Sequence, residues 1–405
     1  MLTHTEALHA VLSAAIPGPV ETRSMDLAAG AVLREDLLAD RDQPPFDRAT
    51  MDGIAFSQTA WEAGVRRLTI EGIQPAGAPA LRLSDPAAGC FRIMTGAVLP
   101  AGCDGVLESE QVLFDETVTV AQIADTAVWQ PHRNVHAQGS DKKAGHVLLA
   151  GGCVLTPQRL AIAISAGAAS VCVSQPLRAM VVSTGNELVD LGEALAPYQI
   201  RPSNAYGLVA ALRDYGCRAA RKHVPDDLES MRELFSASVT EVDLILVSGG
   251  VSKGLYDFVP RALEEAGVEK IFHRVAQKPG KPLWFGQHPQ GATVFGLPGN
   301  PVSTLIGFRE YVVPWLRRSL GLPDALTEWV TLNDLPASVA PLTGYFPVRK
   351  APDMNHPCAV DLVAYQGSGH LAALAESDGY VLIDPEVVPN LTTAIPVPFR
   401  GWGAI

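Results

Sequence analysis

Three glycine-rich turns each follow an apolar run, and each has the composition of a loop that binds an anion through its backbone. They read STGNE at 183–187, SGGVSKG at 248–254 and GLPGNP at 296–301. Glycine lets the backbone approach a ligand more closely than a Cβ would allow, and exposed N–H groups attract negative charge. The turns predict a phosphate-binding site, to which the second and third contribute Ser248, Gly249, Gly250, Ser252, Lys253, Pro298, Gly299 and Asn300.

The third turn also predicts the start of a helix. Asn300 has the side chain of an N-cap residue, and Pro301 presets the backbone angle of a first helical turn. The free N–H groups of that turn carry partial positive charge, which favours an anion. A single turn of this kind is more often only a tight turn, so the prediction depends on all three lying together.

A cationic stretch lies between the second and third turns. The sequence HRVAQKPGKP at 273–282 holds Arg274, Lys278 and Lys281 and no acidic residue. Its prolines restrict the turn, so both lysine heads are expected to point to one place, where they suit a phosphate or another oxyanion. A solvated basic edge strand is the alternative interpretation.

Carboxylates stand at turns and not along helix faces. Glu187 and Asp257 follow the first and second glycine turns, Asp226 opens a helical pattern, and Asp52 lies in TMDG. Beside a phosphate such carboxylates hold Mg²⁺, which takes one or two acids together with phosphate oxygens and water. Metal-assisted phosphate chemistry is the predicted mechanism. The alternatives are a plain N-cap for Asp226 and solvated loop acids for Glu187 and Asp257.

The elements that would position these residues alternate between strand and helix across 177–320. Asn204 and Asp226 are predicted to cap the first two helices. Strand patterns lie at 178–185, 218–224, 243–250 and 292–300, and helical patterns at 204–216, 226–239, 259–267 and 301–320. This alternation predicts a doubly wound, mostly parallel sheet. Ligands bind such sheets outside the carboxyl ends of the strands, where the glycine turns fall.

The rest of the chain has β character, apart from helices expected near the N-terminus and in TPQRLAIAISAGA at 156–168. Short alternating runs separated by glycine and proline predict β-rich modules before the α/β region and a small barrel or sandwich after it. The predicted fold class is therefore multidomain α/β plus β. The domains are an elongated N-terminal or linker domain of 1–43 with 135–175, a β-rich domain of 44–134, an α/β domain of 176–320 and a C-terminal β domain of 321–405.

Composition limits the function classes. The 405 residues carry a formal net charge of −12, which argues against a nucleic-acid surface, although a local cationic pocket can still bind a small anion. The longest apolar run, at 160–173, is too short and too polar to cross a membrane. The six cysteines form no C-x-x-C pair and no secretory signal accompanies them, which predicts a cytoplasmic protein with reduced thiols.

Seven motifs along the chain, the last of them near its end, together resemble the motifs of a known family. In order and spacing they resemble the molybdopterin molybdenumtransferase family, the MoeA-type molybdenum insertases related to the E domain of gephyrin. The resemblance spans nearly the whole chain. The motifs are ATMDGIA at 49–55, RIMTGAVLPAGCDGV at 92–106, VSTGNEL at 182–188, SGGVSKGLYD at 248–257, VAQKPGKP at 275–282, GLPGNPVS at 296–303 and YQGSG at 365–369.

The resemblance implies an elongated homodimer in which the α/β and C-terminal domains form the site with help from the partner subunit. Family members cleave the pyrophosphate of adenylylated molybdopterin with a divalent cation, insert molybdate-derived metal into the dithiolene, and release AMP and molybdenum cofactor. Mg²⁺ is the expected cation, and a molybdopterin adenylyltransferase and an apo-molybdoenzyme are the expected protein partners. The residues implied by motif match are Asp52, Thr95, Asp141, Glu187, Asp226, Asp257, Arg274, Lys278, Lys281, Arg349 and Ser368.

Among these residues Glu187, Asp226 and Asp257 are expected to be both catalytic and metal-binding, and Lys278 is expected to be catalytic. Three departures from the family pattern keep other activities open: Asn186 replaces a common aspartate, Arg201–Pro202 lies where an acid is expected, and 135–140 lacks an arginine run. The alternatives are a tungsten insertase, a non-catalytic cofactor carrier or scaffold, and a molybdopterin adenylyltransferase. The four-region layout favours an insertase, because a lone α/β domain would suffice for adenylylation.

Overall fold

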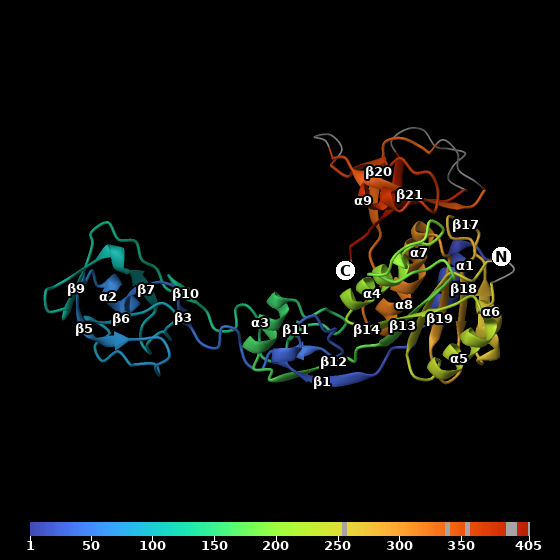
Figure 1. Cartoon of the computed structure of the whole chain (residues 1–405). Coiled ribbons are helices and arrows are strands. Elements are labelled where there is room, and N and C mark those ends of the chain that lie inside the picture. The colour runs from blue at the N-terminus through green and yellow to red at the C-terminus, as the bar shows by residue number, and fades with distance from the viewer. Residues whose placement is uncertain (253–256, 337–340, 353–356, 386–394, 404–405) are drawn as a thin grey trace.

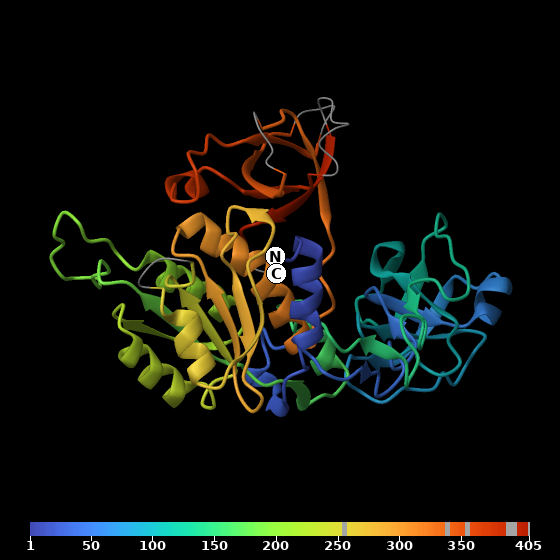
Figure 2. The same ribbon diagram turned by 90° about the vertical axis from the view of Figure 1, so that its right-hand side faces the viewer.

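The protein has an extended, bent shape made of four parts (Figure 1). The computed structural model describes residues 1–252, 257–336, 341–352, 357–385 and 395–403. A β-sheet part lies at one end, a small middle part joins it to an α/β part, and a β-barrel sits against the α/β part, as Figure 2 shows from a second side. Within these described ranges, no helix has both the length and the apolar character that a membrane span needs.

A six-stranded sheet forms the centre of the α/β part. Its strands run parallel from β14 to β19, whereas β18 is antiparallel to both of its neighbours. The chain leaves β13 toward β14 and returns to β15 on the other side of β13, so the strand order reverses between β13 and β15. The strand order is β14 (Arg218–Val224), β13 (Arg178–Thr184), β15 (Leu244–Ser248), β19 (Thr293–Leu297), β18 (Trp284–Gln287) and β16 (Glu269–His273). The predicted doubly wound sheet is confirmed.

Helices cover both faces of this sheet because successive side chains of a strand point to opposite sides. Val181 and Leu246 face a core shared with α1, α4 and α8, whereas Val182 and Val247 face a core shared with α5 and α6. Helix α7 contacts α4 and β19 and also packs against the barrel. The helices are α1 (His4–Ala14), α4 (Ser203–Asp214), α5 (Leu228–Ser238), α6 (Val259–Glu265), α7 (Pro301–Gly307) and α8 (Val313–Ser319).

Two predicted N-caps are wrong. Helix α4 begins at Ser203, so Asn204 lies inside its first turn and leaves its side chain free for other contacts. Helix α5 is capped by Asp227, whose carboxylate accepts the Ser230 N–H at 2.8 Å, and not by Asp226. For α5, two adjacent aspartates offer a capping start in the sequence, and packing of the following apolar face selects the second, whereas α4 has Pro202 at its N-cap position and no side-chain cap.

The predicted single helix over 301–320 is interrupted by a π-helical turn at Phe308–Val312. Pro314 explains the interruption, because it has no N–H to donate to the carbonyl of Glu310 and its ring clashes with that carbonyl. The widened turn buries the side chains of Glu310 and Tyr311 next to each other.

The N-terminal β-sheet part contains one six-stranded sheet with a core on each face. Phe56 and Leu107 belong to one core, and Phe91 and Val106 belong to the other. The short helices α2 (Gln58–Glu62) and η2 (Ser109–Gln111) accompany it. Its strand order is β7 (Gly105–Glu108), β4 (Gly53–Phe56), β6 (Gly89–Ile93), β5 (Arg67–Gln74), β9 (Val120–Ile123) and β8 (Val112–Phe114).

An acid-sensitive ion pair stabilises this sheet. Arg133 donates from Nη2 and Nε to the two carboxylate oxygens of Glu108, at 2.6 and 3.2 Å, and this lowers the pKa of Glu108 to about 2. Because the unfolded pKa is about 4.3, the stabilisation is complete above that pH and is lost as the pH falls toward the folded pKa. Glu108→Gln is therefore expected to lower the free energy of unfolding near neutral pH by about 1.5 to 3 kcal/mol and to weaken its acid dependence. Thermal unfolding at a series of pH values tests this, and an equally steep acid dependence in the variant would contradict it.

The middle part is made of strand pairs that join segments from before and after the N-terminal sheet. The first strand of each pair leads the chain toward the N-terminal sheet and the second leads it back toward the α/β part, so these pairs connect the two ends of the molecule. The pairs are β1 (Val20–Ser24) with β12 (Ser170–Ser174), β2 (Leu37–Leu38) with β11 (Val147–Leu149), and β3 (Arg48–Ala49) with β10 (Val135–His136), beside α3 (Pro157–Ser165) and η1 (Met25–Leu27). The exact division of the chain at 43, 134, 175 and 320 stays a prediction.

The C-terminal part is a small barrel, as predicted. Strand β21 pairs with both β22 and β23, which closes the sheet. Strand β17 (Gln277–Lys278), from the cationic stretch, adds to β21 in parallel. The turn that follows, residues 278–281, which we call the lysine turn, therefore lies where the α/β part meets the barrel. The barrel elements are β20 (Glu328–Leu332), β21 (Thr343–Lys350), β22 (Ala359–Leu362), β23 (Gly379–Ile383), β24 (Ile395–Gly401) and the short helix α9 (Ala372–Ala375).

Candidate functional site

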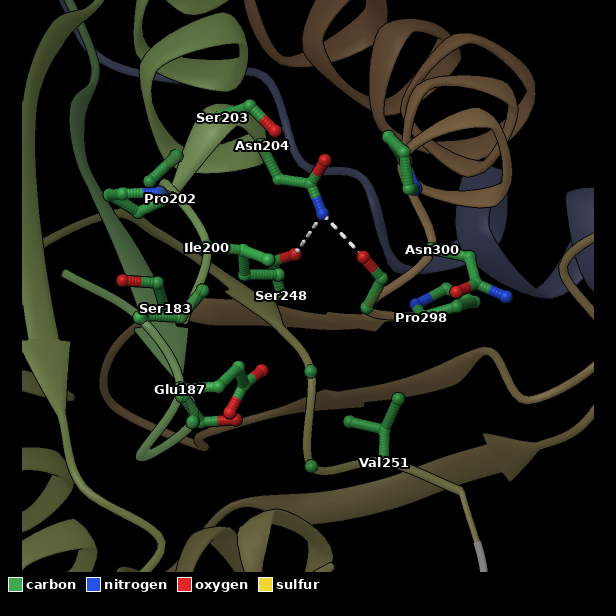
Figure 3. A pocket seen from close by; sticks show the side chains of 18 of the residues that line it. Ser183, Glu187, Ile200, Pro202, Ser203, Asn204, Ser248, Val251, Pro298 and Asn300 are labelled. Atoms are coloured by element: carbon green, nitrogen blue, oxygen red, sulfur yellow. Dashed lines mark hydrogen bonds between the residues drawn. The ribbon is translucent and has the colours of Figure 1, made fainter. Parts of the chain in front are cut away.

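A cavity of about 820 Å³ lies outside the carboxyl ends of β13, β15 and β19. All three glycine turns line it, and Figure 3 shows Ser183 and Glu187 of the first, Ser248 of the second and Pro298 of the third around the same hollow. We call it the glycine-turn cavity. It lies beside the point where the strand order reverses, which is where sheets of this type bind ligands.

Glycine is required where the second turn passes the first. Gly249 and Gly250 both have positive φ, at 100° and 67°. A Cβ at Gly249 would lie 2.8 Å from the hydroxyl oxygen of Thr184, and one at Gly250 would lie 2.7 Å from a methyl carbon of Val259. The backbone of this turn is therefore fixed by its neighbours, with its amides at the cavity wall.

Asn204 ties the second and third turns to helix α4. Its amide nitrogen lies 2.9 Å from the hydroxyl oxygen of Ser248, 2.7 Å from the carbonyl oxygen of Gly299 and 3.2 Å from the hydroxyl oxygen of Thr304. Figure 3 shows Asn204 pointing between these turns. The sequence pattern predicts a helix cap at this position and does not reveal these contacts. The available signal was its position at the same sheet edge as the glycine turns.

Replacing Asn204 by aspartate is expected to loosen the cavity wall. The change keeps the shape of the side chain but turns a donating nitrogen into an oxygen that faces the carbonyl oxygen of Gly299, which can only accept, and two hydroxyl oxygens. We expect the free energy of unfolding to fall by about 1 to 3 kcal/mol and the affinity for inorganic pyrophosphate to fall at least about tenfold. Denaturant unfolding and calorimetric titration measure the two effects.

Asn333→Asp is the matched control for this prediction. Asn333 donates a similar amide bond to Asp361, at 2.8 Å, but in the barrel and away from the cavity. The control should lose stability and keep its affinity for pyrophosphate. Equal affinities in Asn204→Asp and Asn333→Asp would contradict a role of Asn204 in shaping the cavity.

Three carboxylates line the glycine-turn cavity: Glu187, Asp226 and Asp257. The backbone N–H of Asp226 donates to the side-chain oxygen of Asn186 at 3.3 Å, which joins two of the loops that carry the acids. In the part of the chain that the structure describes, no three acidic, histidine or cysteine side chains form a ready-made metal cluster. Separate carboxylates around a phosphate-sized hollow fit Mg²⁺, which keeps part of its coordination for phosphate oxygens and water.

Arg201 also lines this cavity, but its guanidinium is engaged elsewhere. It donates to the backbone carbonyl oxygens of Val189, Asp190 and Glu193, in the loop that precedes it. The Arg201–Pro202 departure from the family pattern thus braces a loop at the cavity mouth. Both terminal nitrogens of Arg201 are therefore directed at backbone carbonyls, although the residue shares its cavity with three acids.

A second cavity, of about 480 Å³, lies between the α/β part and the barrel; we call it the lysine cavity. Lys278 and Lys281 line it from one side, and Tyr345 and Tyr365 line it from the barrel. Among the described residues neither lysine has an ion-pair partner, so both ammonium groups remain available to an anion. The two cavities adjoin, because Pro282, Pro298 and Asn300 line both.

The start of α7 contacts the barrel and is not a fully open anion site. The N–H of Val302 donates to the carbonyl oxygen of Ser368 at 3.1 Å, so one of the amides predicted to be free is already bonded. Asn300 precedes the helix as predicted, but its side chain donates to the Ser368 hydroxyl at 2.7 Å and makes no capping bond. Ser368 lines the lysine cavity and fixes the barrel to the third glycine turn.

Five of the predicted site residues lie outside both cavities. Asp52 accepts the N–H and O–H of Thr95, at 2.6 and 2.7 Å, which lowers the pKa of Asp52. This pair is in the N-terminal sheet part, while Asp141 accepts from His136 at 2.8 Å in the middle part. Arg274 and Arg349 are also outside, and Lys253 lies outside the described residues.

Comparison with known proteins connects this site to a family. Residues 2–167 match the family model of the MoeA N-terminal region (domain I and II), and residues 180–318 match the model named "Probable molybdopterin binding domain". A molybdopterin molybdenumtransferase from Synechocystis sp. is 33% identical over 383 residues, which cover 94% of this chain and 95% of that protein. The chain belongs to the molybdopterin molybdenumtransferase family.

Other members of the molybdopterin molybdenumtransferase family match over similar lengths. The protein from Haemophilus influenzae is 32% identical over 399 residues, which cover 95% of each chain. The crystal structure of the molybdopterin biosynthesis moea protein from Pyrococcus horikosii superposes with a TM-score of 0.81 at 28% identity and covers 100% of both chains. The likeness therefore extends over all four parts of the molecule, and includes the barrel that forms one side of the lysine cavity.

Proposed function

We propose that this protein is a molybdopterin molybdenumtransferase of molybdenum cofactor biosynthesis. It binds adenylylated molybdopterin, cleaves the pyrophosphate with Mg²⁺, inserts molybdate-derived metal into the dithiolene and releases AMP. The observation that carries this proposal is the pair of adjoining cavities. One has glycine amides and carboxylates, the other has two lysines with no ion-pair partner among the described residues, and the shared wall of Pro282, Pro298 and Asn300 lets one extended ligand reach both.

The glycine-turn cavity is suited to the phosphates. The backbone amide of Gly250 and the hydroxyls of Ser248 and Ser252 line it and can donate to phosphate oxygens, whereas the Gly249 N–H is held by the carbonyl oxygen of Leu297 at 3.1 Å. Fixed donors of this type need no rearrangement when charge develops in the transition state, which is the main source of catalysis in phosphoryl chemistry.

Glu187, Asp226 and Asp257 would hold Mg²⁺ in this cavity. When bound, the ion neutralises charge on the phosphate oxygens and so assists departure of AMP. Asn186 contributes an amide oxygen that orients the Asp226 loop, where a carboxylate would add another negative charge.

The lysine cavity is suited to the oxyanion substrate, molybdate. Lys278 and Lys281 supply point charges, Ser368 supplies a hydroxyl, and Tyr345 and Tyr365 give a flat apolar wall. In this arrangement the chain holds the metal oxyanion and the adenylylated end of the pterin in neighbouring hollows, so that binding brings the reacting groups together.

We also propose that the protein works as a homodimer in the cytoplasm. The pair of Asp52 and Thr95 lies in a part of the molecule remote from both cavities, as Figure 1 shows for the sheet that carries it, so a partner's cavity is the place where it can act. All six cysteines are free, and burial raises the pKa of Cys90 and Cys103 to about 12, as expected for inert reduced thiols. A molybdopterin adenylyltransferase and an apo-molybdoenzyme are the proposed partners.

A set of parallel incubations separates the proposed function from its alternatives. The pure protein is mixed with adenylylated molybdopterin, Mg²⁺ and either molybdate or tungstate, or with molybdopterin and ATP, and AMP, adenylylated molybdopterin and the activation of an apo-molybdoenzyme are measured. AMP release with molybdate supports the insertase, and AMP release with tungstate only indicates a tungsten enzyme. Binding without AMP release indicates a carrier. Formation of adenylylated molybdopterin from molybdopterin and ATP indicates an adenylyltransferase.

A further inference from the structure

A buried polar network lies beneath the lysine turn, at the junction of α1, the π-helical turn and the barrel. Gln277, Tyr311 and Tyr345 are each at most 1% exposed, and Glu310 is 3% exposed. Such a concentration of polar groups is costly in a protein interior unless every group is bonded. Gln277 and Tyr345 line the lysine cavity, but apart from the wall that Tyr345 provides, the chemistry proposed above gives these side chains no role.

Gln277 is the centre of this network. Its side-chain oxygen accepts the hydroxyl of Tyr311 at 2.5 Å, with the hydroxyl of Tyr345 at 3.4 Å, and its side-chain nitrogen donates to the carbonyl oxygen of Gly280 at 3.1 Å. Gly280 lies between Lys278 and Lys281, so the bond from the Gln277 side chain to Gly280 closes the lysine turn on itself. A Cβ at Gly280 would lie 2.8 Å from the same nitrogen, which shows how closely the amide fills the turn.

The backbone around Gln277 is fixed from two further directions. Strand β17 pairs Gln277 with Thr343 of the barrel. The N–H of Ala276 donates to the carbonyl oxygen of Leu2 at 2.7 Å, which attaches the N-terminal segment to the same strand. The turn is thus held to the barrel by its backbone and to the α/β part by the Gln277 side chain.

His4 sets the direction of the tyrosine hydroxyls. Its Nδ1 lies 2.8 Å from the Tyr345 hydroxyl and 3.1 Å from the Tyr311 hydroxyl, while its Nε2 faces the Glu310 carboxylate at 3.6 Å. We assign the imidazole proton to Nε2, beside that carboxylate, so that Nδ1 accepts from Tyr345 and the Tyr311 hydroxyl donates to Gln277 over its shorter contact. Burial lowers the pKa of His4, which agrees with a neutral ring. The orientation of the Gln277 amide is therefore determined by its surroundings.

We propose that Gln277 is a positioning residue for oxyanion binding, which holds the backbone of the lysine turn so that Lys278 and Lys281 face the lysine cavity together. This inference rests on the proposed function, in which those lysines bind molybdate. Lysine side chains are long and lose much rotamer freedom on binding. A turn fixed before the ligand arrives reduces the ordering that binding requires.

Molybdate titration of the full chain by calorimetry tests this proposal. Tyr311→Phe removes the hydroxyl that donates to Gln277 and also lies 3.1 Å from His4 Nδ1, and Gln277→Met removes the amide's hydrogen bonds at nearly constant volume. Each is expected to weaken molybdate binding about fivefold or more, because each loses at least one hydrogen bond that orders the turn. Tyr380→Phe is the matched control: Tyr380 is equally buried at the same junction, but its hydroxyl donates to Glu310 at 2.5 Å and not to Gln277. It should lose stability and bind molybdate within about twofold of wild type.

The outcomes separate this inference from the proposed function. Tyr311→Phe binding as tightly as Tyr380→Phe, while Lys278→Ala loses binding, overturns the positioning role alone. Lys278→Ala binding like wild type overturns the oxyanion site itself, and the positioning role with it. In the AMP-release assay the positioning role raises the KM for molybdate with kcat unchanged, whereas a general loss of folded protein lowers kcat. If Gln277→Met does not fold, Tyr311→Phe decides the question.

Discussion

Asp226→Ala is expected to reduce Mg²⁺-dependent AMP release at least about 100-fold, the size of effect seen when one charge-stabilising group leaves a preorganised site. The carboxylate lines the glycine-turn cavity with Glu187 and Asp257. It does not cap α5, because Asp227 does that, so its removal takes away the proposed metal ligand and leaves the helix start intact. The melting temperature should therefore stay within about 1 °C of wild type, since uncoupled surface changes cost little.

Asp227→Ala is the matched control, since it changes the same residue type one position along the chain. Asp227 accepts the N–H and O–H of Ser230, at 2.8 and 2.7 Å. Its loss should lower the free energy of unfolding by about 1 kcal/mol, as for other N-caps, and leave AMP release within about twofold of wild type. The two variants are compared by thermal unfolding and by AMP release over a range of Mg²⁺ concentrations.

Three results would count against the role of Asp226. AMP release unchanged in Asp226→Ala would remove it from the metal site. A large loss of stability in that variant would make it structural. Loss of activity in Asp227→Ala without loss of stability would mean that the functional carboxylate is the other one. The last case is informative, because the sequence alone could not distinguish the two aspartates.

The central sheet was predictable because its elements are local. Each strand is a short apolar run that ends at a glycine or polar turn, and each helix has an apolar face at helical spacing, so residues such as Val181, Val182 and Phe235 carry the signal themselves. The position of the glycine turns followed from this, since parallel strands bring their carboxyl ends to one edge. The parallel topology of the sheet was therefore enough to predict that three separate loops converge on one cavity.

The features that the sequence did not reveal depend on contacts between distant segments. The pairing of β17 with β21, which carries the lysine turn to the barrel, joins residues about sixty positions apart, and no local pattern marks it. The role of Asn204 depends on Gly299 and Thr304 lying opposite it in space. The π-helical turn did have a local signal, Pro314, but an apolar helix pattern on both sides concealed it.

The division into two cavities also could not be read from the sequence. The lysines and the acids were predicted to serve one anion site, and the structure places them in adjoining hollows separated by Pro298 and Asn300. The separation arises because the lysine turn is bonded to the barrel through Gln277 and Thr343. Charge and motif identify which side chains bind anions, whereas the packing of two domains decides which of them meet the same anion.

Mixing two inactive variants is expected to restore activity. Asp52→Ala and Asp257→Ala should each lose nearly all AMP release, because we propose that a complete site takes Asp257 from one chain and Asp52 from its partner. Thr95 holds the Asp52 carboxylate through two bonds, which lowers its pKa and keeps it ionised in the N-terminal sheet part. Random re-pairing of equal amounts makes half of the dimers mixed, each with one intact site, so about a quarter of wild-type activity should return.

Asp226→Ala mixed with Asp257→Ala is the control, since both changes fall in the same cavity of one chain and every mixed dimer has two damaged sites. That mixture should stay inactive. If Asp52 only shapes the turn that contains Thr95, Asp52→Ala alone would lose melting temperature and keep its AMP release. If Asp52 acted within its own chain by a large movement of the N-terminal sheet, the mixture would recover nothing. Recovery in the first mixture and none in the second requires a site shared between two copies.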